Sequence, residues 1–168
     1  MTFSPEILST AERVIDLARQ RGWRIGAAES CTGGLLMAAL TEIAGASDVV
    51  AAGFVTYADD AKVELLGLDA ENLEEHGAVS KRVAQWMARG ALDAAGLDLA
   101  VAITGIAGPH GGSEEKPLGL VHIATARRQG KRIILDHKEV RYGDLGRHQV
   151  RMRAVLAALL MLEAAAGH

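Results

Sequence analysis

Three side chains that can act as nucleophiles stand side by side in the segment AESCTGG, residues 28–34, as Ser30, Cys31 and Thr32. A hydroxyl or thiol can attack a carbonyl carbon when a base removes its proton. Small residues before a helix also leave backbone N–H groups that can bind a phosphate or a developing oxyanion. The segment is therefore either a nucleophile turn or a turn that only caps a helix and binds phosphate, and local sequence alone favours the second.

A base for such a nucleophile has two sources in this chain. Six histidines are present, but no arrangement of them points to a nucleophile. Lys62 follows a predicted strand end by about one helical turn, and burial can lower the pKa of a lysine from about 10.4 towards neutrality. Tyr57, nearby in the sequence, can orient or relay a proton. The alternative for Lys62, a solvated charge on a helix surface, is the more common one.

Cys31 competes with Ser30 because a thiol at a helix N-terminus can have a lowered pKa and react as a thiolate. The same residue is typical of a small apolar core position. The sequence contains no HxH, HExxH or CxxC spacing, and Asp59 and Asp60 are typical of a helix start. We therefore expect no metal and no cofactor.

Apolar periodicity and turn residues predict an alternation of helices and strands. Helices are predicted at residues 5–21, 35–44, 59–65, 80–95 and 145–165, and strands at 23–28, 50–57, 97–104, 118–126 and 132–140. This order predicts an α/β layered fold in which the last two strands, joined by a polar turn, introduce an antiparallel strand into a parallel sheet.

Ligands of open α/β sheets bind outside the carboxyl ends of strands. The AESCTGG segment, Tyr57 and a loop that begins at Thr104 all follow predicted strand ends. The loop, TGIAGPHGGSEEKPLG at residues 104–119, contains five glycines and is too long for a simple connection. It is therefore a second candidate for the functional site.

Length and composition restrict the class of protein. A chain of 168 residues predicts one domain, residues 1–168, and 49% apolar residues suffice for a core. Only 4% aromatic residues and a net charge of -3 argue against nucleic-acid binding. The single cysteine excludes an internal disulfide and fits a reducing compartment. The longest apolar run, residues 154–162, is too short to span a membrane, and no secretion signal is visible, so we expect a cytoplasmic protein.

Four separated blocks occur in the order found in one known family: AESCTGG at 28–34, FVTYADDAK at 54–62, HGAVS at 76–80 and the loop at 104–119. Over nearly the whole chain they resemble the CinA C-terminal domain family, whose standalone members are nicotinamide-nucleotide amidases. The resemblance implies a three-layer αβα sandwich around a mixed, mainly parallel sheet of about five strands. It also implies hydrolysis of nicotinamide mononucleotide to nicotinic acid mononucleotide and ammonia in pyridine-nucleotide recycling.

Carried over residue by residue, the resemblance places the nucleophile on Ser30, the general base on Lys62 and an assisting tyrosine on Tyr57. The family's phosphate-binding arginine falls on Arg147 and its second arginine, four residues on, falls on Arg151, although GDLGRHQVR has two residues more than the family pattern before them. The expected substrate-binding residues are Cys31, Thr32, Gly33, Gly34, Thr104, Gly105, Gly108 and Arg147.

Other readings of the same sequence stay open. Glu114, Glu115 and Lys116 match the family loop, but their chemistry assigns them no catalytic role, and a lid or a subunit contact is equally compatible. The Ala/Leu-rich final helix is compatible with a homo-oligomer and with a core. A nucleotide-binding regulatory module without strong activity, or a hydrolase of another amide or ester, is the alternative function.

Overall fold

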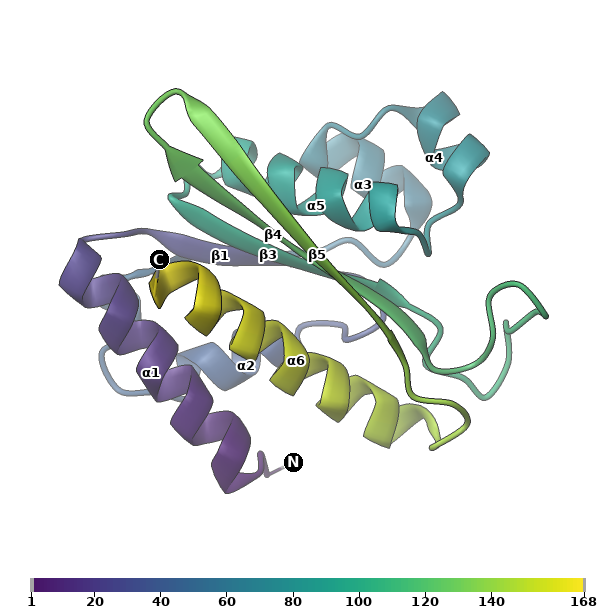
Figure 1. Cartoon of the computed structure of the whole chain (residues 1–168), viewed down its shortest axis with the longest axis horizontal. Coiled ribbons are helices and arrows are strands. Elements are labelled where there is room, and N and C mark those ends of the chain that lie inside the picture. Colours follow the sequence, from purple (N-terminus) through teal and green to yellow (C-terminus); the bar gives the residue numbers. More distant parts are fainter. Residues whose placement is uncertain (1, 168) are drawn as a thin grey trace.

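The computed structural model describes residues 2–167, which form a five-stranded sheet with helices on both faces (Figure 1). In chain order the elements are α1 (Pro5–Arg21), β1 (Ile25–Glu29), α2 (Leu35–Thr41), the 3-10 helix η1 (Ala46–Asp48), β2 (Val50–Val55), α3 (Asp59–Leu66), α4 (Ala70–His76), α5 (Lys81–Ala94), β3 (Leu99–Gly105), β4 (Leu120–Gln129), β5 (Arg132–Arg141) and α6 (Arg147–Gly167).

The strand order is β2-β1-β3-β4-β5. β1 pairs in parallel with both β2 and β3, whereas β4 pairs antiparallel with β3 and β5. Only β4 therefore runs against the other strands. Helices α1, α2 and α6 cover one face of the sheet, and α3, α4 and α5 cover the other (Figure 1). The three-layer αβα sandwich with a mixed, mainly parallel sheet is confirmed.

Each face of the sheet has its own apolar core. Along β3, Val101 and Ile103 point into the core under α1 and α6, whereas Ala102 points into the core under α5. Small residues on the α5 side allow close packing: a β-carbon on Gly90 of α5 would collide with the carbonyl oxygen of Leu66. This contact holds α3 against α5 and so fixes the helix that carries Lys62.

The caps predicted for two helices are present. Ser4 Oγ accepts the N–H of Ile7 at the start of α1, and Ser80 Oγ accepts the N–H of Val83 at the start of α5. Two details differ from the sequence prediction. The helix α2 ends at Thr41 rather than running to Gly45, and α4 was not predicted, because it buries only Leu73 and has no periodic apolar face.

No helix within residues 2–167 is long and apolar enough to cross a membrane.

Candidate active site

The carboxyl ends of β1, β2 and β3 lie next to one another, as the strand pattern predicted. Ser30 follows β1, and its N–H donates to the carbonyl oxygen of Ile103 in β3 at 2.9 Å. On the other side, the N–H of Thr56, directly after β2, donates to the carbonyl oxygen of Glu29 at 2.9 Å. Glu29 is therefore fixed to the end of β2, and Ser30 is fixed to β3.

The turn after Ser30 depends on its two glycines. Gly33 and Gly34 have φ values of 59° and 95°, in the left-handed region that strains any residue with a β-carbon. The Gly33 N–H donates to the carbonyl oxygen of Ser30 at 3.1 Å and closes the turn. A β-carbon on Gly33 would also lie 3.3 Å from Nη2 of Arg151. Both predicted glycines are thus required for the path of the backbone.

Glu29 occupies the N-terminus of α2, a role that sequence reasoning missed. Its side chain is fully buried, and the carboxylate accepts the N–H groups of Gly34, Leu36 and Met37 at 2.9 to 3.1 Å. A carboxylate already neutralises the positive end of this helix. A phosphate could bind these N–H groups only by displacing the Glu29 carboxylate. The turn therefore lacks free donors for the phosphate-binding role that was the alternative interpretation. The available signal was a glutamate that ends an apolar strand before a glycine turn.

Two N–H groups of the turn stay available for an oxyanion. The N–H groups of Gly33 and Gly34 are engaged, by Ser30 and by Glu29. Those of Cys31 and Thr32 make no hydrogen bond to another residue in the described part of the chain. Of the four N–H groups of residues 31–34, those of Cys31 and Thr32 therefore remain as the candidate oxyanion donors.

Lys62 is buried, with 1% of its surface exposed, so its interpretation as a solvated surface charge is wrong. Its Nζ lies 3.1 Å from Asp59 Oδ1 and 3.4 and 3.5 Å from the carbonyl oxygens of Ala58 and Tyr57. The tight packing of α3 on α5 explains the burial. Within residues 2–167, Nζ makes no hydrogen bond to Ser30, and catalytic hydrogen bonds often form only when substrate is bound.

Arg147 joins three parts of the predicted site. Its Nη2 donates to the Tyr57 hydroxyl at 2.8 Å, and its Nη1 donates to the carbonyl oxygen of Gly108 at 3.0 Å. One guanidinium at the start of α6 thus connects the end of β2 with the glycine-rich loop. Arg151, one turn further along α6, donates from Nη2 to the carbonyl oxygen of Thr32 at 2.8 Å.

Thr104 and Gly105 serve the framework in this structure. The Thr104 hydroxyl is buried and donates to the carbonyl oxygen of Ala78 at 2.7 Å, which ties the end of β3 to the segment before α5. A β-carbon on Gly105 would lie 2.7 Å from the carbonyl oxygen of Leu120. Lys116 Nζ donates to the carbonyl oxygen of His76 at 3.1 Å and attaches the loop to α4. The third and fourth sequence blocks therefore contact each other.

Buried polar atoms without a partner gather around the same turn. Within residues 2–167 they are Thr32 Oγ1, Thr56 Oγ1 and Arg151 Nε. A buried donor or acceptor without a hydrogen bond is costly, so native structures contain few of them. They belong to residues that contact the segment around Ser30: the Thr56 N–H donates to Glu29, and Arg151 donates to Thr32. Thr56 therefore joins the candidate site on structural grounds, and Arg151 joins it together with Arg147.

The Cys31 thiol is not activated. Burial raises its pKa to about 12, against the smaller lowering effect of a hydrogen bond from its own backbone N–H; the Glu29 carboxylate raises the pKa further, and Arg151 and Arg147 lower it. The thiol is therefore protonated at neutral pH and cannot act as a thiolate. The interpretation of Cys31 as a small core residue is confirmed, since the side chain belongs to the core under α1 and α6.

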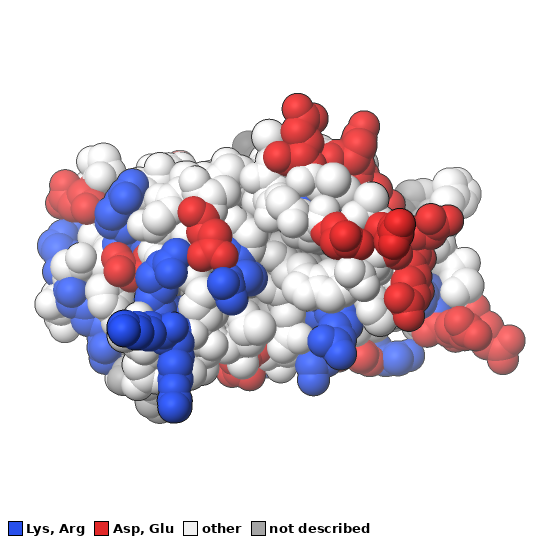
Figure 2. All heavy atoms as spheres, turned by 90° about the horizontal axis from the view of Figure 1, so that it is seen from above, with Lys and Arg blue, Asp and Glu red and all other residues white. Residues whose placement is uncertain are grey.

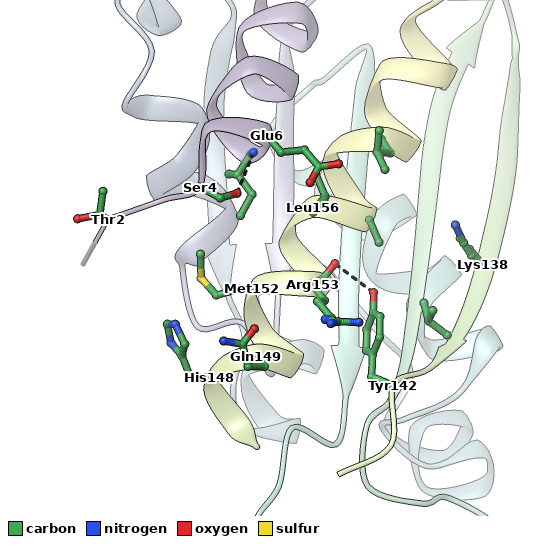
Figure 3. A pocket seen from close by; sticks show the side chains of 14 residues that line it. Thr2, Ser4, Glu6, Lys138, Tyr142, His148, Gln149, Met152, Arg153 and Leu156 are labelled. Carbon is green, nitrogen blue, oxygen red and sulfur yellow. Dashed lines mark hydrogen bonds between the residues drawn. The ribbon is translucent and has the colours of Figure 1, made fainter. Parts of the chain in front are cut away.

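A groove of about 640 Å³ lies away from the predicted residues, between the start of α1, the face of β5 and α6 (Figure 3). Glu6, Met152 and Arg153 line it together with Tyr142, whose hydroxyl donates to the carbonyl oxygen of Arg153 at 3.0 Å (Figure 3). None of the predicted site residues borders this groove. In the part of the chain that the structure describes, no three His, Cys, Asp or Glu side chains are placed to hold a metal ion.

The fold and the site together define a class: a three-layer α/β domain with a serine turn and a buried lysine at the ends of adjacent parallel strands. Residues 7–166 match the family model described as "CinA C-terminal domain". The chain belongs to this family.

The chain resembles both relatives of about its own length and relatives that are much longer. "Nicotinamide-nucleotide amidohydrolase PncC" of Escherichia coli (strain K12) is 46% identical over 157 residues, which are 94% of this chain and 93% of that protein. A "CinA-like protein" of Syntrophobacter fumaroxidans is 49% identical over 152 residues, but these are 90% of this chain and only 35% of that protein. The chain thus spans about a third of the longer relatives.

A solved structure shares the whole fold. The structure described as "competence/damage inducible protein CihA from Agrobacterium tumefaciens" has a TM-score of 0.94 and 50% sequence identity. The match covers 100% of this chain and 99% of that one.

Proposed function

We propose that this chain is a nicotinamide-nucleotide amidase, which hydrolyses the carboxamide of nicotinamide mononucleotide to nicotinic acid mononucleotide and ammonia. The observation that carries the proposal is the buried Lys62 in α3, the helix that follows β2, because β2 pairs in parallel with the strand β1 that leads into Ser30. Its support from relatives is the name "Nicotinamide-nucleotide amidohydrolase PncC" on proteins of Enterobacter agglomerans and Escherichia coli (strain K12), 48% and 46% identical and matched over 84% and 93% of their own length.

In the proposed reaction, Ser30 Oγ attacks the carboxamide carbon while Lys62 Nζ accepts the hydroxyl proton. Collapse of the tetrahedral intermediate breaks the C–N bond, and Lys62 returns a proton to the leaving ammonia. Lys62 then takes a proton from water as the water oxygen attacks the acyl carbon, and it passes this proton to Ser30 Oγ as the C–Oγ bond breaks, which releases the acid and restores both residues. Tyr57, whose backbone carbonyl lies beside Lys62 Nζ, assists the placement of these groups.

Two sets of groups are proposed to bind the substrate, one at its carboxamide and one at its phosphate. The N–H groups of Cys31 and Thr32 would hold the oxyanion, a contribution of about 3 to 4 kcal/mol per donor in other acyl-transfer enzymes. Arg147 would meet the phosphate, because its guanidinium is exposed and already lies between Tyr57 and the loop at Gly108. Charge-assisted contacts of this kind suit a phosphate dianion.

Asp59 must release Lys62 in this scheme. It lies 3.1 Å from Lys62 Nζ, and its side chain is 63% exposed, so it can rotate into solvent without disturbing the core. When Asp59 moves away, Lys62 Nζ keeps the carbonyl oxygens of Ala58 and Tyr57 at 3.4 and 3.5 Å as acceptors.

Incubation of the purified protein with nicotinamide mononucleotide, followed by an ammonia assay, tests the proposal. Ser30→Ala and Lys62→Met should release no ammonia above background, whereas Cys31→Ala should stay active. No ammonia from the wild type above the Ser30→Ala control would rule out the amidase. Tight binding of the nucleotide without turnover would instead support a nucleotide-binding module.

We also propose a cytoplasmic location and a homo-oligomeric assembly. The net charge of -3 and the acidic side chains that gather over α3, α4 and the nearby loop (Figure 2) fit a protein without nucleic-acid or membrane partners. In the proposed oligomer a second copy covers the face of α6 on which Leu160, 43% exposed, borders the groove. Light scattering coupled to gel filtration measures the mass, and a monomer at all concentrations would refute the oligomer.

A further inference from the structure

The carboxylate of Glu29 is buried beside the proposed nucleophile, and both of its oxygens are used. Oε1 accepts the N–H of Met37 at 2.9 Å, and Oε2 accepts those of Gly34 and Leu36 at 3.1 and 3.0 Å. A buried carboxylate is strongly disfavoured unless hydrogen bonds replace its hydration. Three N–H groups at the start of a helix supply this compensation.

These bonds span the turn from one end to the other. Glu29 directly precedes Ser30, and Gly34 is the residue from which α2 begins. The contact from the Glu29 side chain to the Gly34 N–H therefore closes a ring that contains the backbone of residues 30–33. The Glu29 backbone is itself fixed, since its carbonyl oxygen accepts the N–H of Thr56 from β2.

The arrangement decides which N–H groups face the site. Because Gly34, Leu36 and Met37 donate inward to Glu29, they are not available to a ligand. Cys31 and Thr32 lie within the closed ring and keep their N–H groups unpaired within residues 2–167. Within residues 31–37, the Glu29 side chain thus uses one set of N–H groups for the structure and leaves another set for the proposed reaction.

We propose that Glu29 is a positioning residue of the amidase site, an inference that rests on the proposed function. Its carboxylate holds the turn so that Ser30 Oγ and the N–H groups of Cys31 and Thr32 act on the same carboxamide. It also accepts the N–H groups of Gly34, Leu36 and Met37, so that these donors are not available to the substrate phosphate. Glu29 touches neither the substrate nor the proton that is transferred.

The variant Glu29→Gln keeps the size and shape of the side chain but places an NH2 group where an acceptor is needed. A misplacement of reacting groups by about 1 Å can cost about 100-fold in rate. We therefore expect kcat to fall by about 100-fold, with KM for nicotinamide mononucleotide nearly unchanged, because the turn acts on the transition state. Glu29→Asp, which keeps the acceptor on a shorter side chain, should recover part of kcat.

Asp69→Asn is the matched control. Asp69 Oδ1 accepts the N–H of Asn72 at 2.9 Å and caps α4. This variant also loses a carboxylate cap, but on a helix that contributes no proposed catalytic residue. Its kcat should equal that of the wild type. A folded Glu29→Gln variant with wild-type kcat, or an equal loss of kcat in Asp69→Asn, would overturn the proposal.

A second readout does not depend on amidase activity. In 15N-labelled protein, Glu29→Gln should shift the amide resonances of Cys31 and Thr32 as well as those of its three partners, and inorganic phosphate should leave Leu36 and Met37 unshifted in the wild type. If the wild type released no ammonia, the amidase would be refuted, and unchanged Cys31 and Thr32 resonances would separately refute the hold on the turn. If Glu29→Gln failed to fold, Glu29→Asp would take its place in both measurements, and a wild-type kcat with unshifted resonances would overturn the proposal.

Discussion

Cys31 should be chemically inert in the folded protein even though it lies next to the proposed nucleophile. Burial raises the pKa of its thiol to about 12, so at about pH 8 roughly one thiol in 10⁴ is ionised. In the unfolded chain, where the pKa is about 8.5, roughly one in four is ionised. Because the thiolate is the reactive form, the native protein should react with a disulfide reagent more than about 10³-fold more slowly than the unfolded chain.

The reaction of Cys31 with Ellman's reagent, followed by absorbance in buffer and in denaturant, measures this ratio directly, since the chain has one cysteine. The same reasoning predicts that Cys31→Ala keeps its ammonia release and loses about 1 kcal/mol of unfolding free energy. Ser30→Ala is the control, because it should lose activity and keep the slow thiol. Fast labelling of the native protein, or loss of turnover in Cys31→Ala alone, would refute the assignment.

Three further outcomes are expected. Arg147→Ala should raise KM for nicotinamide mononucleotide by about 10- to 100-fold, the value of a charge-assisted contact of about 1.5 to 3 kcal/mol; steady-state kinetics should show little change for nicotinamide riboside, which lacks the phosphate, and equal losses on both would contradict the role. Burial lowers the folded-state pKa of both His122 and His137, whose rings lie 3.0 Å apart from Nδ1 to Nε2, so the unfolded chain binds more protons and stability is lost as pH falls below about 6.5. Urea unfolding at a series of pH values should show that the double variant His122→Asn/His137→Asn loses less unfolding free energy on acidification than the wild type. An equal dependence on pH in the two proteins would refute the contribution of the histidine pair. Thr104→Val should lower the unfolding free energy by about 1 kcal/mol, because the partly buried Ala78 carbonyl loses its donor, while Thr104→Ser should keep the wild-type value, as measured by thermal unfolding.

Most of the fold followed from local signals in the sequence. Ser4 before Pro5 and Gly22 after Arg21 mark both ends of α1, and the structure uses Ser4 as the cap and Gly22 in the left-handed conformation. The uninterrupted apolar run at residues 97–104 predicted a strand, and in the structure six of the seven residues of β3 are buried. These signals sufficed because each depends on neighbours within one turn or one strand.

The candidate site was predicted less completely. The segments that meet at Ser30 were found, because each follows a strand end, and strand ends of a parallel sheet share one edge. The contact of Arg147 with Tyr57 and Gly108 was not predictable, since it depends on where the last helix begins relative to the loop. Arg151 was matched to the family's second arginine, but its contact with Thr32 was not predictable, and the buried, unpaired hydroxyl of Thr56 depends on tertiary packing that no local pattern encodes.

Burial of the two charged groups beside Ser30 shows why local rules gave the wrong alternative for Lys62 and no role for Glu29. An isolated carboxylate or ammonium is best left in water, so statistics place both on the surface. Tertiary structure changes the balance, because the start of α2 offers N–H groups to the Glu29 carboxylate, and the segment between β2 and α3 offers the carbonyl oxygens of Tyr57 and Ala58 to Lys62 Nζ. N–H groups at a helix start favour an anion, and carbonyl oxygens accept hydrogen bonds from a lysine amine. The backbone groups around each buried side chain therefore match the sign of its charge, and both sets of groups belong to segments that follow neighbouring parallel strands.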